Sequence, residues 1–280
     1  MGSIEMTEIN ELQKIANKIR ATCVQMAFDA SHGHLKSALS CVEILVALYW
    51  RWLKVSPSNP ADPHRDRFYM SKGHGVTSLY AVLAEKGIID RKELAMYAKS
   101  GSCLPDHPCK HMLPVLEASS GSLGHCLGIA TGALYALRLK GNPARAVVLM
   151  SDGECNEGSV WEAAMFARAQ KLENLLAIVD YNDMQAVGFS DEIMGHTLLE
   201  EKFRSFGWAA KRINGNSISE LADCLESFPF EKDKPSVIVA KTKVGVSFME
   251  KNILWHYRTP SGEELMAAID ELGELPIQTG

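Results

Sequence analysis

The chain has 280 residues, and its 29 Lys and Arg against 34 Asp and Glu give a formal net charge of −5. Hydrophobic residues make up 46% and charged residues 22%, which excludes an intrinsically disordered chain. The slight acid excess argues against nucleic-acid binding, and the absence of a long apolar run or signal peptide argues against a membrane partner. Seven scattered Cys indicate reduced thiols in a cytoplasmic protein.

The first part of the chain is predicted to be mainly helical, with an N-terminal helical segment over about 5–55. Residues 101–121 mix Pro, His, Cys and Ser without a period, and a loop of this length is usually functional. The elements expected before that loop are helices over 8–29 and about 40–53, a strand at 68–71, and helices near 75–86 and 91–99.

After residue 123, helices alternate with short apolar strands, which indicates a doubly wound, mostly parallel α/β sheet with helices on both faces. No linker interrupts the pattern, so residues 1–280 are predicted to form a single domain. The expected elements are a helix at about 124–139, a strand at 146–150, a helix at about 159–170, a strand at 175–180, an irregular loop through Gly195, a helix–strand–helix–strand series ending at 237–240, and a closing helix at about 261–271.

Two of these strands end in polar residues that suit a hard metal ion. Asp152 follows one strand, and Asn182 follows the next strand, 30 residues further on. Ligands of doubly wound sheets bind outside the carboxyl ends of the strands, so both side chains are expected at one edge. With a nearby backbone carbonyl they offer oxygen ligands for Mg²⁺, and Gly153 lets a diphosphate approach closely. The alternative is that Asp152 and Asn182 only shape turns.

Asp152-Gly153 followed by Asn182 resembles the thiamin diphosphate motif, with Ser151 in place of the motif's first Gly. Several families share this motif, but further segments narrow the resemblance to transketolase. The resemblance spans about residues 8–265 and implies the diphosphate-binding domain of the thiamin diphosphate-binding fold. The matching segments, in the family's order, are 31–35, 66–74, 104–108, 120–124, 152–162 and 255–256.

The resemblance implies thiamin diphosphate and Mg²⁺ as cofactors. Asp152, Asn182 and the backbone carbonyl of Met184 would hold the metal ion against the diphosphate. The cofactor-binding residues that it implies are His74, Gly121, Ser122, Leu123, Gly153, Glu154, Glu157, Asn182 and His256.

Four of the nine His lie inside matching segments. The resemblance implies that His34 and His107 face a sugar substrate and assist its proton transfers. His74 and His256 would contact the diphosphate side of the cofactor and share in catalysis. The near-neutral pKa of histidine suits this work. A histidine in a loop is otherwise most often solvated, which is the interpretation for His125.

Some features also have structural or competing interpretations. Glu157 is either an acid in the first turn of a helix or, by the resemblance, a residue at a subunit interface near the partner's cofactor. Ser159 and Glu162 have capping-box spacing. A zinc site is an alternative for the group Cys103, His107, Cys109 and His111, although the spacing does not match paired Cys-x₂-Cys ligands.

Transketolases move a two-carbon ketol unit from a ketose, often a phosphate ester, to an aldehyde. In that family a Glu on a second, pyrimidine-binding domain activates the cofactor. This chain stops at Gly280 without a second α/β unit. The resemblance therefore implies the N-terminal (alpha) half of a split transketolase, active only with a C-terminal (beta) subunit in an alpha2beta2 assembly.

Departures from the family pattern leave the substrates open. Lys36 lies in a segment where the family is rich in Gly, His32 stands where a small residue is common, and Asp106 replaces a Gly. A biosynthetic enzyme with a non-sugar acceptor or acyl transfer is one alternative. The others are the alpha subunit of a 2-oxoacid dehydrogenase and a non-catalytic binding or regulatory homologue. The segments around His34 and His74 argue against the dehydrogenase.

Overall fold

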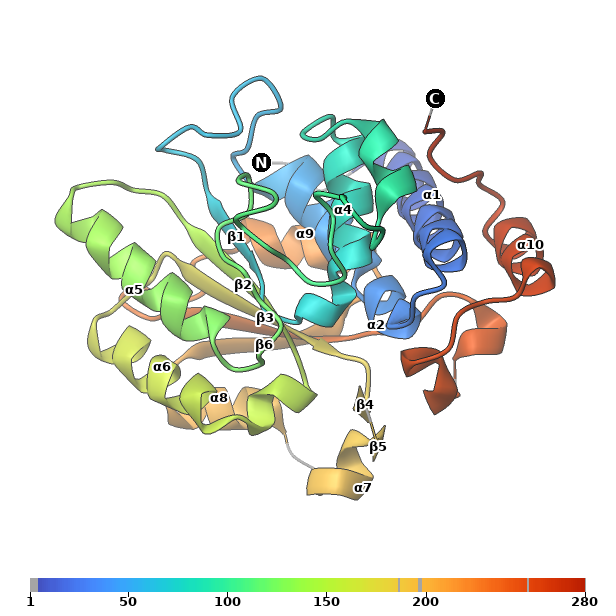
Figure 1. Cartoon of the computed structure of the whole chain (residues 1–280). Coiled ribbons are helices and arrows are strands. Elements are labelled where there is room, and N and C mark those ends of the chain that lie inside the picture. The colour runs from blue at the N-terminus through green and yellow to red at the C-terminus, as the bar shows by residue number, and fades with distance from the viewer. Residues whose placement is uncertain (1–4, 186, 196–197, 251, 280) are drawn as a thin grey trace.

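The computed structural model describes residues 5–185, 187–195, 198–250 and 252–279, so Gly280 lies outside the described residues. Its centre is a five-stranded sheet in which every strand runs parallel to its neighbours (Figure 1). The predicted α/β class with a parallel sheet is confirmed. In spatial order the strands are β1 (Arg67–Met70), β2 (Ala146–Ser151), β3 (Leu175–Tyr181), β7 (Ser236–Lys241) and β6 (Ala209–Asn214).

Helices cover both faces of this sheet (Figure 1). Side chains alternate along each strand, so Val147 and Leu149 join one apolar core while Val148 and Met150 join the other. Burial on both faces explains why β2 and β3 are apolar throughout most of their length. The first core is covered by α1 (Met6–Ala30), α3 (Val42–Ala47), α4 (Val76–Glu85) and α9 (Ile218–Glu226), and the second by α5 (Cys126–Leu139), α6 (Gly158–Ala169) and α8 (Leu199–Ser205).

Three segments differ from the sequence-based prediction. The second helix begins at α2 (Leu35–Ser40), because His34 holds a left-handed φ of 63° and the helical turns start directly after it. It continues through α3 into a π-helical turn at Leu48–Trp52. The helix expected at 91–99 is a short 3₁₀ helix, Arg91–Met96. The expected loop before Gly195 contains a hairpin of β4 (Met184–Gln185) and β5 (Gly188–Phe189) and the helix α7 (Ser190–Met194).

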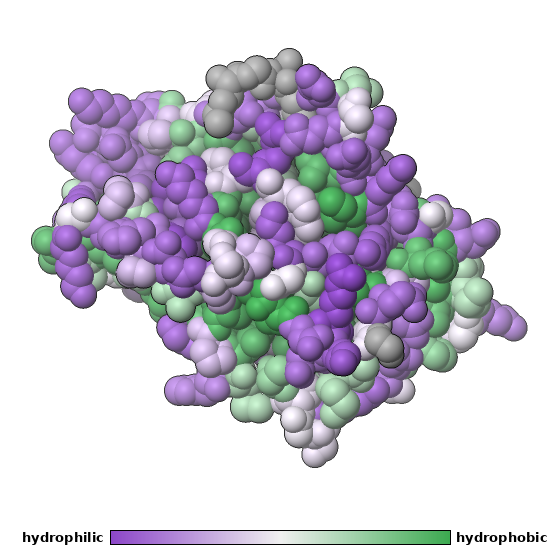
Figure 2. All heavy atoms as spheres, turned by 90° about the horizontal axis from the view of Figure 1, so that it is seen from above, coloured by the Kyte–Doolittle hydropathy of each residue, from purple (hydrophilic) through white to green (hydrophobic). Residues whose placement is uncertain are grey.

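The closing helix is α10 (Gly262–Leu272), with a complete capping box between Ser261 and Glu264. It packs beside α1, where the Asn17 amide donates to the carbonyl of Leu272 over 3.0 Å. Among the described residues, no helix combines the length and the apolar character needed to cross a membrane. Seen from above, the surface is mainly hydrophilic, with hydrophobic residues in several separate areas (Figure 2).

Candidate active site

The carboxyl ends of three adjacent strands meet at one edge of the sheet. β1 leads into Ser71 and Lys72, β2 leads into Asp152, and β3 leads into Asn182. Because β1 pairs with β2 and β2 pairs with β3, these three ends lie side by side. The structure therefore brings Asp152 and Asn182 to the edge where ligands of such sheets bind.

A fully buried ion pair joins Lys72 to Asp180 at this edge. The hydroxyl of Ser40 donates to Asp180 Oδ2 over 2.6 Å, and the hydroxyl of Thr242 donates to Oδ1. Burial alone would lower the pKa of the Lys72 ammonium, but Asp180, Cys41 and Asp152 together raise it above its usual value. We call Ser40, Lys72, Asp180 and Thr242 the paired-charge cluster.

No role for the paired-charge cluster is predicted from the sequence. The sequence offers only the positions of two members as a signal: Lys72 comes two residues after the end of β1, and Asp180 is the second-last residue of β3. Lys72 is close enough to act electrostatically on Asp152 and on two of the predicted site histidines, His74 and His256. The paired-charge cluster therefore lies close to these predicted site residues at the carboxyl edge of the sheet.

The four predicted catalytic histidines lie together. The ring of His34 is 5.0 Å from that of His256, 5.8 Å from that of His74 and 5.9 Å from that of His107, measured between centroids. The backbone N–H of His34 donates to the carbonyl of His256 over 2.9 Å. We call His34, His74, His107 and His256 the histidine cluster.

Burial lowers the pKa of three rings of the histidine cluster. The pKa of His256 falls to about 4, that of His74 falls well below its usual value, and that of His34 also falls. Neighbouring imidazoles add to the lowering in each case, and the Lys72 ammonium adds to it for His74 and His256. At neutral pH these three rings are uncharged, so each carries one N–H donor and one acceptor nitrogen.

Asp106 brings a carboxylate to the histidine cluster at a position where the family pattern has a Gly. Its Oδ2 lies 3.4 Å from His107 Nδ1 and 3.4 Å from His32 Nε2. The Asp106 side chain is 45% exposed, so water screens its charge. His32 and Asp106, both departures from the family pattern, therefore contact each other beside a predicted substrate-facing histidine.

The loop that contains Gly121 passes close to His107. At Gly121, φ is 153°, and a Cβ there would lie 3.2 Å from His107 Cδ2. A Cβ on Gly73 would lie 3.0 Å from the backbone nitrogen of Gly121. Glycine at both positions permits these close approaches. Of the other residues predicted in this loop, Ser122 is exposed and Leu123 is half-buried.

Glu154, a predicted cofactor contact, is fully buried and holds this loop in place. Its carboxylate accepts from the backbone N–H of Gly124 over 2.8 Å and from the hydroxyl of Ser71. Burial raises the pKa of Glu154, and these hydrogen bonds partly offset the effect. The structure thus gives Glu154 a positioning part between two segments of the site, and direct contact with a cofactor remains a prediction.

Asp152 is buried beneath the segment that follows β3. The hydroxyl of Ser190 donates to Asp152 Oδ2 over 2.6 Å, and a Cβ on Gly153 would lie 3.1 Å from Gln185. Burial raises the pKa of Asp152 to about 6, and the nearby Asp180 contributes. A cation bound to this carboxylate would stabilise its charged form.

Asn182 shapes the turn that begins this segment. Its Oδ1 accepts from the backbone N–H of Met184 over 3.1 Å, and its Nδ2 donates to Ser40 Oγ over 3.4 Å. The turn-shaping interpretation of Asn182 therefore holds, but it does not exclude the metal role. An amide oxygen has a second lone pair, which remains available to a metal ion.

Lys36, noted as a departure from the family pattern, is 5% exposed and reaches the same segment. Its ammonium donates to the sulfur of Met184 and to the carbonyl of Glu250, the latter over 2.5 Å. Burial lowers the pKa of Lys36. Lys36 also acts electrostatically on His256, which places it beside the histidine cluster.

The capping box expected between Ser159 and Glu162 is not formed. The helix α6 begins after Glu157, and the hydroxyl of Ser159 instead donates to the carbonyl of Gly124 over 2.9 Å. A Cβ on Gly124 would lie 2.7 Å from Glu157 Cβ, so Glu157 borders the Gly121–Gly124 loop. Glu157 is exposed at the protein surface.

Nothing in the structure favours the zinc alternative. Within the part of the chain that the structure describes, no three His, Cys, Asp or Glu side chains are grouped so that they could hold a metal ion. The thiol of Cys103 instead lies 3.2 Å from the carboxylate of Glu93. Of the four residues in the zinc alternative, His107 is the one with another predicted role, as a member of the histidine cluster.

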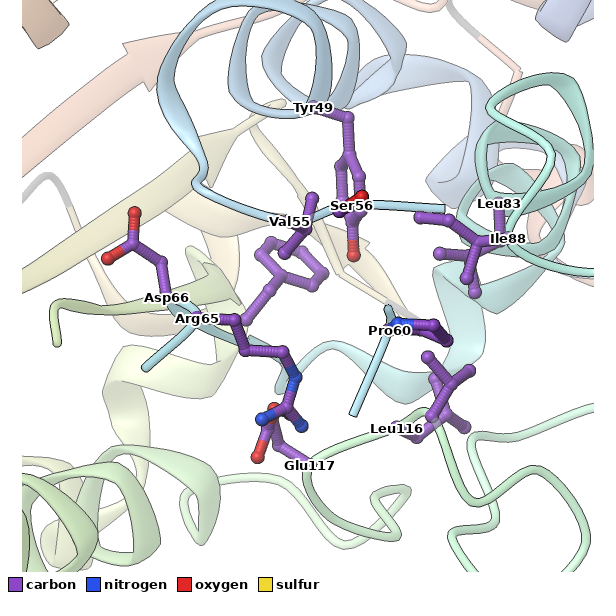
Figure 3. Close-up of a pocket in the computed structure, with 12 residues that line it drawn as sticks. Tyr49, Val55, Ser56, Pro60, Arg65, Asp66, Leu83, Ile88, Leu116 and Glu117 are labelled. Atoms are coloured by element: carbon purple, nitrogen blue, oxygen red, sulfur yellow. Dashed lines mark ion pairs between the residues drawn. The ribbon is translucent and has the colours of Figure 1, made fainter. Parts of the chain in front are cut away.

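A separate pocket lies near the start of β1 and contains none of the predicted site residues (Figure 3). Val55 and Phe68 contribute apolar surface to it, and the ion pair between Arg65 and Glu117 borders it. Asp66 is tied to Arg145 over 2.5 Å at the same place. The start of the 66–74 segment, at Asp66 and Phe68, therefore stabilises the fold, while its end, at Lys72 and His74, lies at the candidate site.

Comparison with known proteins agrees with this geometry. Residues 11–272 match the family described as transketolase, thiamine diphosphate binding domain. The chain belongs to this family.

The chain is 41% identical over 266 residues to an apulose-4-phosphate transketolase subunit of Actinobacillus succinogenes, covering 94% of this chain and 96% of that one. It is 37% identical over 264 residues to the 6-deoxy-6-sulfo-D-fructose transketolase subunit SqwG of a Clostridium species, with the same coverage. The solved transketolase of Leishmania mexicana shares the fold, with a TM-score of 0.89 at 24% identity. The alignment covers 95% of this chain but only 42% of that one.

The residues at the sheet edge fit the cofactor of this family. Asp152 and Asn182 supply hard oxygen donors of the kind that Mg²⁺ accepts, and the buried Asp152 carboxylate has no ammonium or guanidinium group within ion-pair distance among the described residues. The glycine at position 121 keeps a side chain out of the space beside His107 of the histidine cluster. These observations fit a diphosphate held through a divalent ion.

Proposed function

We propose that this chain is the N-terminal, cofactor-binding subunit of a two-chain transketolase. The observation that carries the proposal is the histidine cluster beside the oxygen donors Asp152 and Asn182, at the carboxyl edge of a parallel sheet. Membership of the transketolase family makes this interpretation stronger than the dehydrogenase, the acyl-transfer and the non-catalytic alternatives.

The reaction is transfer of a two-carbon ketol unit from a ketose phosphate to an aldehyde. Two similar chains are named as transketolase subunits for apulose 4-phosphate and 6-deoxy-6-sulfo-D-fructose, and both names describe sugars with an anionic group. Thiamin diphosphate, when bound, supplies the carbon nucleophile and the electron sink that this transfer needs.

The protein's own part in the reaction is to bind the substrate and move protons. The imidazole rings of His34 and His107 can donate to a carbonyl oxygen or accept from a hydroxyl of the sugar, and we assign them that task. His74 and His256 lie nearer to Lys72 and would bind the diphosphate side of the cofactor while keeping water out. Lowered pKa values keep His74 and His256 uncharged near neutral pH, so each can offer one N–H donor and one acceptor nitrogen to the cofactor.

Asp152, Asn182 and the backbone carbonyl of Met184 would hold Mg²⁺. The carboxylate supplies the charge, and the two neutral oxygens complete the protein's share of ligands. Gly153 keeps the strand end free of a side chain, while Glu154 fixes the Gly121–Gly124 loop, whose Gly121, Ser122 and Leu123 would line the cofactor.

A partner chain with the pyrimidine-binding domain would supply the Glu that activates the cofactor in this family. Exposed apolar side chains on α5 and α6, namely Ile129, Met165 and Phe166, offer a surface that suits another protein chain. Glu157 is exposed at the start of α6, in keeping with a place at the subunit interface. We propose an alpha2beta2 assembly in which residues 1–280 form one domain of each alpha chain.

We place the complex in the cytoplasm. The seven Cys are all free, and five of them are buried. Burial raises the pKa of the buried thiols Cys23, Cys41, Cys126, Cys155 and Cys224. Free thiols of this kind are typical of reducing compartments.

Reconstitution tests the proposal. The chain is mixed with its beta chain, thiamin diphosphate and Mg²⁺, and transfer of a ketol unit from a ketose phosphate to an aldehyde is measured. Activity is expected only when both chains are present, and EDTA should remove it. Robust activity of the isolated chain would refute the split enzyme, and oxidation of a 2-oxoacid in place of transfer would refute the transketolase assignment.

A further inference from the structure

Lys36 is a buried ammonium whose direct contacts are uncharged. Its side chain on α2 is 5% exposed, and its Nζ donates to the Met184 sulfur and to the backbone carbonyl of Glu250. A thioether sulfur is a weak acceptor, so the carbonyl is the one strong partner among these contacts.

Other buried cations of this protein are paired with a carboxylate. Arg20 contacts Glu43 over 2.5 Å, and Lys72 contacts Asp180. Among the described residues, by contrast, no carboxylate lies within ion-pair distance of Lys36 Nζ. The Glu250 carboxylate acts on Lys36 only from a greater distance, and it accepts a hydrogen bond from the Gly245 N–H over 2.9 Å.

A buried ammonium without a carboxylate partner is costly to the folded state, and an anion bound beside it from outside the chain would offset that cost. Lys36 contacts the side chain of Met184, whose carbonyl is a proposed metal ligand, and it acts electrostatically on His256. Lys72 is not available as a cationic contact for such an anion, because Asp180 already neutralises its charge.

We propose that Lys36 binds the diphosphate of thiamin diphosphate directly, as a second cationic contact beside the metal ion. This inference rests on the proposed function and deepens it. The family pattern does not require a cation here, since its corresponding segment is rich in Gly. Direct binding by Lys36 also explains why a residue of such high desolvation cost stands in the first turn of α2.

The test compares cofactor binding by the complex of both chains with and without the Lys36 charge. Dissociation constants for thiamin, thiamin monophosphate and thiamin diphosphate are measured with Mg²⁺ by quenching of tryptophan fluorescence, for which the buried Trp255 beside His256 is a natural reporter. Lys36→Met should weaken binding of thiamin diphosphate roughly 10- to 100-fold, the range of a charge-assisted hydrogen bond. Binding of thiamin should stay unchanged, and Lys36→Arg should restore much of the loss.

Thermal unfolding without cofactor separates binding from folding. Lys36→Met removes an unpaired buried charge, so its unliganded Tm should equal or exceed that of the wild type, while the Tm increase caused by thiamin diphosphate should shrink. Lys232→Met, a change at an exposed lysine, is the matched control and should alter neither value.

The outcomes distinguish the two proposals. If the wild-type complex binds thiamin diphosphate and Lys36→Met binds it equally tightly, the inference about Lys36 is wrong and the proposed function stands. A lowered unliganded Tm with unchanged affinity would also overturn it, in favour of a structural role. If the wild-type complex binds no thiamin diphosphate, the proposed function fails and the inference fails with it.

Discussion

The paired-charge cluster and the histidine cluster both lie at the carboxyl edge of the sheet, and they differ in whether their buried side chains are charged. In the paired-charge cluster, Lys72 and Asp180 are fully buried and neutralise each other, with hydroxyl groups completing the hydrogen bonds. In the histidine cluster, burial instead suppresses the charge of His34, His74 and His256, and Nδ1 of His34 has no hydrogen-bond partner among the described residues.

This difference separates residues that stabilise the site from residues that serve ligands. Groups whose hydrogen bonds and charges are satisfied within the chain have little left to offer a ligand, whereas unsatisfied buried groups destabilise the folded state until a ligand binds them. Asp152 resembles the histidine cluster in its charge alone: it accepts hydrogen bonds from Ser190 and Gly153, but no cation contacts it within the described part of the chain, and burial raises its pKa to about 6.

The largest effect is expected from Asp152→Ala, which should reduce ketol transfer by the complex to background. Loss of the only carboxylate among the proposed metal ligands removes the charge that holds Mg²⁺. Steady-state assays at saturating thiamin diphosphate measure this, with Asp223→Ala, a change at an exposed residue of α9, as the control. Retention of even a tenth of the activity would show that the metal ligands lie elsewhere.

Breaking the paired-charge cluster should affect folding. Lys72→Met leaves Asp180 buried without a cation and is expected to lower the free energy of unfolding by about 3–5 kcal/mol. Denaturant unfolding without cofactor measures this change. The double variant Lys72→Met/Asp180→Asn should recover part of the loss, because it removes the orphaned charge. A single variant as stable as the wild type would contradict the division between the two regions.

The histidine cluster should make stability fall in acid. His256 has a pKa of about 4 when folded, against about 6.5 in an unfolded chain, so between these values the unfolded state binds more protons. Acidification from pH 6.5 to 4 therefore removes stability, by about 1 kcal/mol per pH unit for this side chain. Other groups contribute to the total, and Asp152 contributes with the opposite sign because its folded pKa is raised.

A difference measurement isolates the contribution of His256. Unfolding free energies of the wild type and of His256→Gln are compared across this pH range, and the variant should lose stability less steeply. His64→Gln, at an exposed histidine, serves as the control and should follow the wild type. Parallel curves for the wild type and His256→Gln would show that burial does not suppress the charge of this ring.

The smallest effect is expected at Asp106, which is half exposed and screened by water. Asp106→Asn removes a negative charge from the side of His107, so KM for a ketose phosphate should fall about two- to fivefold while kcat changes less than twofold. Kinetics at low and high salt measure this, since screening should erase the difference. An increase in KM would mean that the carboxylate binds a substrate hydroxyl group.

The sequence predicted the parts of the molecule whose signals are local. β2 and β3 are apolar runs rich in β-branched residues, and each histidine of the histidine cluster lies in its own matching segment. The Lys72–Asp180 pair was not predictable in this way. The two residues are 108 positions apart, and they meet only because β1, β2 and β3 lie in that spatial order.

Lys36 illustrates the same limit. The sequence marks it as a departure from a family pattern, but its burial depends on Met184 and Glu250, which other segments bring to it. The failed capping box at Ser159 has a similar cause, because a carbonyl on the Gly121–Gly124 loop captures the hydroxyl. Local propensity decides such details only where no tertiary partner competes.

The His34 N–H donates a hydrogen bond to the His256 carbonyl, so it links two residues that the ribosome adds at very different stages of synthesis. Gly33 is held equally closely to Tyr257, since a Cβ there would lie 2.5 Å from the Tyr257 carbonyl oxygen. A nascent chain can form β1, β2 and β3 long before residue 256 leaves the ribosome, but it cannot complete the histidine cluster. The histidine cluster therefore forms only after synthesis has passed residue 256, so a product truncated before that residue cannot assemble it.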